Sequence, residues 1–112
     1  MSKHAQLKPG VVIFPNTFIG PNVEIGRNVL IQPNSVVNHD TVIGDYTIIT
    51  SGACISGNVK IGYSCYLGTN VSTKQDITIG NESLVGAGSV VTKNILSREI
   101  HVGNPAKFLK NL

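Results

Sequence analysis

The sequence predicts an all-β domain built as a parallel β-helix, and three observations lead to this fold class. A branched aliphatic residue recurs at every sixth position, Gly and Asn are frequent between these positions, and large aromatic residues are rare. Of the 112 residues, 41% are hydrophobic, 5% are aromatic and 13% are charged. This composition excludes a disordered chain and a core built on bulky aromatic residues, and it favours β structure with turns.

The repeat runs from Ile13 to Val91, and thirteen of its fourteen positions carry Ile, Val or Leu. Its members are Ile13, Ile19, Ile25, Ile31, Val37, Ile43, Ile49, Ile55, Ile61, Leu67, Thr73, Ile79, Val85 and Val91. The residue two positions earlier is almost always small or of medium size, and in a strand both positions point to the same side. A unit of six residues cannot bury its own apolar face, so the units must stack until the aliphatic residues form one interior column.

An 18-residue period indicates three hexapeptides in each triangular coil. Every third member of the column from Ile25 to Ile79 is followed by Gly, whereas the other two walls lack this uniformity. We expect about 4.7 coils over residues 11–95, stacked at about 4.8 Å per coil. Seven column residues are followed by Gly in all, and we interpret these glycines as turn residues with positive φ. Thr73, the one polar member of the column, predicts a bulge or loop at residues 72–76.

Two short segments flank the repeat. Residues 1–10 form an N-terminal arm, and residues 96–112 form a tail that caps the open end of the stack, where unpaired strands would otherwise invite aggregation. Within the tail we expect a short helix at residues 105–111, with Asn104 as its N-cap and Pro105 at its first position.

One outer wall predicts a contact between subunits. The residues directly before the column positions should face solvent, and on this wall all five are apolar or aromatic. They are Val12, Leu30, Ile48, Tyr66 and Leu84. Because a contiguous exposed apolar stripe marks an interface, we expect a homo-oligomer in the form of a closed trimer. The alternative is that the C-terminal segment covers the stripe.

Charge and motif patterns exclude several classes of protein. The net charge of +3 comes without the interleaved basic and aromatic residues of a nucleic-acid site, and an anionic small ligand explains it as well. No stretch approaches the roughly 20 apolar residues of a membrane span, and the N-terminus lacks the apolar run of a signal peptide, so we expect a cytoplasmic protein. Cys54 and Cys65 form neither a disulfide framework nor a metal-ligand pattern, and we expect reduced thiols and no metal.

His39 is the candidate for chemistry, because it is the one His inside the repeat. It lies two residues after Val37, at a corner, so its ring should project outward. One coil later the same position is Gly57, and an imidazole beside a glycine amide supplies a base and an oxyanion donor. Asp40 follows directly and is placed to orient the ring. The alternative is a solvent-facing corner His without a task.

Three segments together resemble the left-handed β-helix acyltransferases. They are residues 37–44, which contain Asn38-His39-Asp40, residues 85–93, which are rich in Gly, and residues 102–107, which contain Gly-Asn-Pro-Ala-Lys. Over roughly residues 11–109 the sequence is most similar to the sialic-acid O-acetyltransferases and the nucleotide-amino-sugar N-acetyltransferases. The resemblance implies acetyl-CoA as co-substrate, no metal, and acetyl transfer to an amino or hydroxyl group of a sugar or sugar nucleotide.

The same resemblance implies roles for single residues. His39 would be the general base, Asp40 would modulate it, and the Gly57 amide would bind the thioester carbonyl oxygen. Lys107, together with Lys93 or Lys110, would meet the CoA phosphates. The pantetheine arm would run between two subunits, past backbone groups of Gly68, Thr69, Gly86 and Ala87.

Members of this group also carry an N-terminal α/β domain that binds the nucleotide sugar. The first coil here begins about eleven residues into the sequence, so we expect that domain to be lacking. The acceptor would then be recognised by the prism alone or with a separate protein, or the chain would be inactive. The alternatives to this enzyme are a non-catalytic β-helical module that binds CoA or serves assembly, and an acetyltransferase for a small non-sugar acceptor such as an amino acid.

Overall fold

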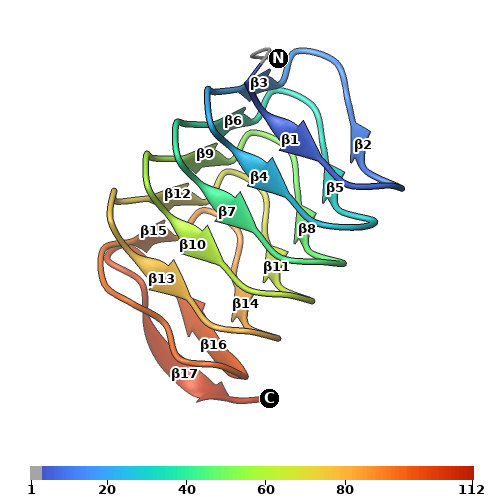
Figure 1. The fold of residues 1–112 in the computed structure, drawn as a ribbon. Coiled ribbons are helices and arrows are strands. Elements are labelled where there is room, and N and C mark those ends of the chain that lie inside the picture. Colours follow the sequence, from blue (N-terminus) through green and yellow to red (C-terminus); the bar gives the residue numbers. More distant parts are fainter. Residues whose placement is uncertain (1–3) are drawn as a thin grey trace.

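The computed structural model describes residues 4–112, which form seventeen strands and no helix. The strands wind into a three-sided prism whose coils stack from the N-terminal to the C-terminal end (Figure 1). The predicted fold class is confirmed, because the chain is a left-handed parallel β-helix of about five coils. Residues 4–112 contain no helix that is long and apolar enough to cross a membrane.

Each wall of the prism is one sheet, in which hydrogen-bonded neighbours along the stack come from successive coils. Sheet A contains β1 (Gln6–Leu7), β4 (Glu24–Ile25), β7 (Val42–Ile43), β10 (Lys60–Ile61) and β13 (Thr78–Ile79). Sheet B contains β2 (Val12–Ile13), β5 (Leu30–Ile31), β8 (Ile48–Ile49), β11 (Tyr66–Leu67), β14 (Leu84–Val85), β16 (Glu99–Val102) and β17 (Lys107–Asn111). Sheet C contains β3 (Phe18–Ile19), β6 (Val36–Val37), β9 (Cys54–Ile55), β12 (Ser72–Thr73) and β15 (Val90–Val91).

The core is the predicted column. Its members from Ile19 to Val91 are all buried, and so are the smaller residues two positions before them from Val23 to Ser89. Full burial of one such aliphatic side chain stabilises the fold by about 1.5–3 kcal/mol. The hydroxyl groups among the smaller residues donate to backbone carbonyls, as Thr47 does to Gly62 at 2.7 Å. Each coil therefore adds one layer of apolar core with its polar groups paired.

The glycines that follow the column positions do not have the predicted positive φ. Positive φ occurs instead at the turn position two residues after these glycines. In the described part of the chain, twelve residues other than Gly have positive φ, and most of them are Asn or Asp. A Cβ added at Gly44 would lie only 2.5 Å from the carbonyl carbon of Gly62 in the next coil. Glycine is needed here because adjacent coils approach closely, while Asn and Asp tolerate the left-handed turns.

The prediction of a bulge at residues 72–76 is wrong. Thr73 is buried in β12 and pairs in continuous register with Val91 of β15. Its hydroxyl oxygen accepts the Ser56 N–H at 3.1 Å, and the Ser56 hydroxyl donates to the Thr73 carbonyl at 2.7 Å. A polar residue fits the column at this point because these side-chain bonds join the two neighbouring coils.

The predicted helix at residues 105–111 is also wrong. β16 adds to sheet B parallel to β14, and β17 turns back to pair antiparallel with β16. The free edge of β16 offers backbone partners to residues 107–111, and this favours a strand over an isolated helical turn. The C-terminal segment thus covers the end of sheet B as a two-stranded hairpin (Figure 1).

Candidate functional site

His39 projects outward at the corner between β6 and β7, as the sequence predicted, and 59% of its side chain is exposed. Asp40 has a left-handed backbone, with φ of 60°, and its N–H donates to the Pro21 carbonyl of the preceding coil at 3.1 Å. Its carboxylate oxygen Oδ2 lies 2.9 Å from His39 Nδ1. In a neutral ring this contact favours the proton on Nδ1, which leaves the lone pair of Nε2 able to accept a proton.

Gly57 lies against the His39 ring, one coil further along the prism. A Cβ at this position would lie 2.5 Å from His39 Cε1 and closer still to Nε2, so only glycine leaves room for the ring. The Gly57 carbonyl accepts the Asp76 N–H at 3.2 Å, whereas the Gly57 N–H donates to no group within residues 4–112. The fold therefore brings a basic ring nitrogen, a carboxylate and an available amide to one corner.

The predicted pantetheine contacts lie on a different corner, between sheets B and C. Gly68 and Gly86 are successive there, and a Cβ on Gly68 would lie 2.6 Å from the Ala87 nitrogen. The Gly88 N–H donates to the Thr69 carbonyl at 2.7 Å, and both Thr69 and Ala87 are exposed. Within one chain, the width of sheet C therefore lies between these residues and His39.

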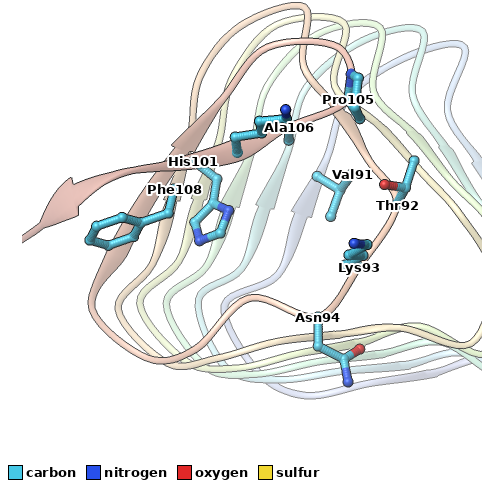
Figure 2. A pocket seen from close by; sticks show the side chains of 9 residues that line it. Val91, Thr92, Lys93, Asn94, His101, Pro105, Ala106 and Phe108 are labelled. Atoms are coloured by element: carbon cyan, nitrogen blue, oxygen red, sulfur yellow. The ribbon is translucent and has the colours of Figure 1, made fainter.

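Two of the predicted phosphate contacts, Lys93 and Lys107, line one cavity of about 340 Å³ at the C-terminal end of the prism. Figure 2 shows the corner residues Lys93 and Asn94 across this space from His101 and Phe108 of the hairpin. The lining side chains include no Asp or Glu, and Lys110 is not among them. The cavity is thus open to an anionic group.

Sequence reasoning missed a second histidine–carboxylate pair at this end. His101 Nε2 lies 3.0 Å from Glu99 Oε1, and the two side chains are only 13% and 18% exposed. The ring also meets Phe108 edge to face, with centroids 5.9 Å apart. His101 pairs with Val85 and so takes the column position of the last coil. A signal was present, because the six-residue step resumes from the buried Ile95 to His101.

The two cysteines lie in different surroundings. Cys65 is buried, and burial raises the pKa of its thiol, which makes it a poor nucleophile. Cys54 is exposed on sheet C, and both thiols are free. Within residues 4–112 no three His, Cys, Asp or Glu side chains gather to hold a metal ion.

The predicted apolar stripe forms on the outer face of sheet B. Its five residues stand in direct register from β2 to β14, and Ile100 of β16 continues the row. Val12 and Tyr66 are 50% and 43% exposed. β17 pairs beside β16 at the end of the sheet, so the hairpin leaves these two side chains uncovered. The role of the stripe as a subunit contact remains a prediction.

Comparison with protein families gives one match, to the family described as the GMPPB C-terminal domain, over residues 1–100. A comparison with the curated proteins finds no match. Among solved structures, PerB from Caulobacter crescentus, in complex with CoA and GDP-perosamine, is 26% identical with a TM-score of 0.69. The match covers 96% of this chain and 55% of PerB.

Two further solved structures have the same fold. Soybean serine acetyltransferase is 31% identical with a TM-score of 0.75, over 80% of this chain and 41% of that one. The acetyltransferase domain of PglB from Neisseria gonorrhoeae, in complex with acetyl coenzyme A, is 27% identical with a TM-score of 0.74, over 96% and 55%. The chain spans about half the length of these structures. The resemblance to hexapeptide-repeat acetyltransferases is confirmed.

Proposed function

The chain belongs to the family described as the GMPPB C-terminal domain, and from this premise we propose that it is an acetyl-CoA-dependent acetyltransferase. The acceptor is an amino or hydroxyl group of a sugar or sugar nucleotide. The observation that carries the proposal is the exposed His39 ring, which is held by Asp40 at 2.9 Å and lies against Gly57. Acetyltransferases at 26–31% identity support the class of reaction.

In the proposed reaction, His39 Nε2 takes the proton from the acceptor nitrogen or oxygen while that atom attacks the thioester carbon. The Gly57 N–H donates a hydrogen bond to the carbonyl oxygen, on which negative charge develops. Asp40 keeps the Nδ1 proton in place and stabilises the imidazolium. The carbon–sulfur bond then breaks, the acetyl group stays on the acceptor, and the thiolate takes up the proton from His39. Acetyl-CoA supplies the activated acetyl group.

The cavity at the C-terminal end supports binding of the donor. Lys93 follows His39 and Gly57 in the same corner column, at 18-residue steps, and it shares the cavity with Lys107. At about 4.8 Å per coil, Lys93 stands roughly 10 Å beyond Gly57 along the axis. Two lysines at that distance are suited to the phosphates of a molecule whose thioester lies at Gly57.

A trimer is part of this proposal, because the site draws on two corners of the prism. His39 and Gly57 lie on one corner, and the pairs Gly68–Thr69 and Gly86–Ala87 lie on another. Within one chain the His39 corner lies opposite sheet B, so the contact would be heterologous. The stripe of one chain would face the His39 corner of its neighbour and bring the Gly68 and Gly86 corner, which borders sheet B, toward that His39. Sedimentation that gives a stable monomer at micromolar concentration would contradict this part. We further infer a cytoplasmic location, where acetyl-CoA is available.

The test is release of CoA thiol from acetyl-CoA in the presence of a panel of acceptors that includes GDP-perosamine, dTDP-4-amino-4,6-dideoxyglucose and L-serine. We expect turnover with an amino sugar nucleotide and its loss in His39→Ala. Glu82→Gln is the control, because Glu82 is exposed and lies on the corner between sheets A and B, away from His39 and from the donor path. A His39→Ala variant as fast as the parent would contradict the role of His39.

A second candidate function is acetylation of a small amino-acid acceptor. The soybean serine acetyltransferase, at 31% identity over 80% of this chain, favours its inclusion. Turnover with L-serine and none with the sugar nucleotides would select it. Binding of acetyl-CoA without turnover of any acceptor would select the non-catalytic module instead.

A further inference from the structure

The outer face of sheet A is hollowed at its N-terminal end. Two depressions of about 290 and 230 Å³ lie on it. Both are lined by Gln6 of β1 and Glu24 of β4, so the two depressions adjoin each other at these residues. The floor of the groove extends to Val42 of β7, and its far end lies at Lys8 and Asp45. We call this hollow the sheet A groove.

The sheet A groove begins at the corner that carries His39. Asn22 lines its near end and occupies the same corner position as Asp40, one coil earlier. Glu24 pairs in register with Val42, which follows His39 by three residues. The Glu24 backbone is therefore one coil and one short strand connection away from the base, a span of roughly 10 Å.

The groove also runs in the opposite direction from the expected donor site. Lys93 and Lys107 lie at the C-terminal end of the prism, beyond Gly57. The acceptor must approach the thioester from a side that the donor does not occupy. On the His39 corner that side faces the N-terminal coils, where the groove lies.

The chemistry of the groove suits a polyhydroxylated ligand. The side chains of Gln6, Asn22 and Glu24 make no hydrogen bond to other groups of residues 4–112, so their amide and carboxylate groups are available. Glu24 is the carboxylate common to both depressions. The one Lys of the groove, Lys8, lies at its far end, where Asp45 also lines it. The near end is lined by His4, Gln6, Asn22 and Glu24, and Glu24 is its one carboxylate, so it offers hydrogen-bond acceptors to sugar hydroxyl groups.

We propose that the sheet A groove binds the sugar ring of an amino-sugar acceptor, with Glu24 accepting hydrogen bonds from its hydroxyl groups. This inference rests on the proposed function, and it names the acceptor class as an amine-bearing sugar. Glu24 is then a specificity-determining residue. It holds the ring so that the neutral amine nitrogen meets His39 Nε2, which takes up one of its protons during the attack.

The test compares Glu24→Gln with the parent, using GDP-perosamine and dTDP-4-amino-4,6-dideoxyglucose as acceptors. We expect the acceptor KM to rise about tenfold or more, since a charge-assisted hydrogen bond is lost. The KM for acetyl-CoA and the melting temperature should stay as in the parent. Glu82→Gln is the matched control, because Glu82 is an exposed Glu on the corner between sheets A and B. An unchanged acceptor KM in Glu24→Gln, or an equal rise in the control, overturns the proposal.

Calorimetry without acetyl-CoA separates this proposal from the proposed function. Binding of either sugar nucleotide that is lost in Glu24→Gln supports the groove even where no turnover is found. Turnover with the same acceptor KM in the parent and in Glu24→Gln supports the proposed acetyltransferase activity and overturns the proposal that the groove binds the acceptor. Absence of both binding and turnover with both sugar nucleotides also overturns the groove.

Discussion

Within residues 4–112 the prism holds two histidine–carboxylate pairs, with nearly equal N–O distances and opposite surroundings. His39 and Asp40 are 2.9 Å apart on an outer corner, with 59% and 52% of their side chains exposed. His101 and Glu99 are 3.0 Å apart inside the last coil, with 13% and 18% exposed. The nitrogen–oxygen distance therefore does not distinguish the roles of the two pairs. The surroundings of the free ring nitrogen must be compared instead.

The surroundings distinguish the pair that we propose as reactive from the pair that supports the fold. In the outer pair Nδ1 is bound and Nε2 lies over Gly57, whose N–H is available. In the inner pair Nε2 is bound, and the same Glu99 oxygen also accepts the Leu96 N–H at 3.2 Å. The inner pair thus ties the hairpin to the end of the column, while the outer pair leaves its base open to a substrate.

The largest expected effect comes from His39→Asn compared with His101→Asn. His39→Asn should lower kcat by about 10²–10⁴-fold, because general-base catalysis is lost, with the melting temperature unchanged. His101→Asn should lower the melting temperature and leave kcat within about threefold. Thiol release and thermal unfolding of both variants check this. Equal losses of activity in the two variants would erase the distinction between the pairs.

A change at Gly57 should come next in size. Gly57→Ala places a Cβ within 2.5 Å of His39 Cε1, so the ring must move away from the amide. We expect kcat to fall by about 10²-fold, because the displaced ring no longer meets the acceptor while the N–H of residue 57 stays in place. The melting temperature should stay close to that of the parent, because the group that must move is the end of an exposed side chain. A crystal structure of the variant with the ring in its original place, together with normal turnover, would contradict the role of Gly57.

Asp40→Asn tests the carboxylate of the outer pair. Asn tolerates the left-handed backbone at this position, so the corner should be preserved. The ring loses the negative charge that stabilises the imidazolium, and we expect kcat to fall about tenfold with the acetyl-CoA KM unchanged. Glu82→Gln, on another corner, serves as the control for removal of a surface charge. A parental kcat in Asp40→Asn would show that His39 does not need the Asp40 carboxylate.

The outer site was predictable from the sequence because the coil period fixes which corner residues stack. His39 and Gly57 are 18 residues apart, and the column from Ile13 to Val91 sets that period without reference to any other contact. The apolar stripe on sheet B followed from the same register. Each of these features depends on the spacing of residues along the chain and on little else.

The features that the sequence did not predict depend on contacts with a neighbouring coil. Gly44 has an ordinary φ, and the reason for glycine is the backbone of Gly62 in the next coil. Thr73 stays in the column because Ser56 completes its hydrogen bonds. The tail forms β17 because β16 presents a free edge. His101 was missed because the step from Val91 to Ile95 breaks the six-residue count.

The smallest expected effect comes from Glu99→Gln in the inner pair. The amide can still accept hydrogen bonds from His101 and from the Leu96 N–H, so the hairpin should remain folded and lose about 1 kcal/mol of stability. For a domain of this size that corresponds to a melting temperature lower by roughly 4–8 °C. The KM for acetyl-CoA should rise about threefold, because the same hairpin carries Lys107.

A parental kcat at saturating acetyl-CoA is the decisive reading for Glu99→Gln. It would show that the inner pair acts by positioning the hairpin and not by proton transfer, since loss of a catalytic carboxylate lowers kcat itself. Lys107→Ala provides the comparison, with a larger rise in the KM for acetyl-CoA and an unchanged melting temperature. A tenfold fall in kcat for Glu99→Gln, with Lys107→Ala unaffected, would instead make the His101–Glu99 pair part of the chemistry.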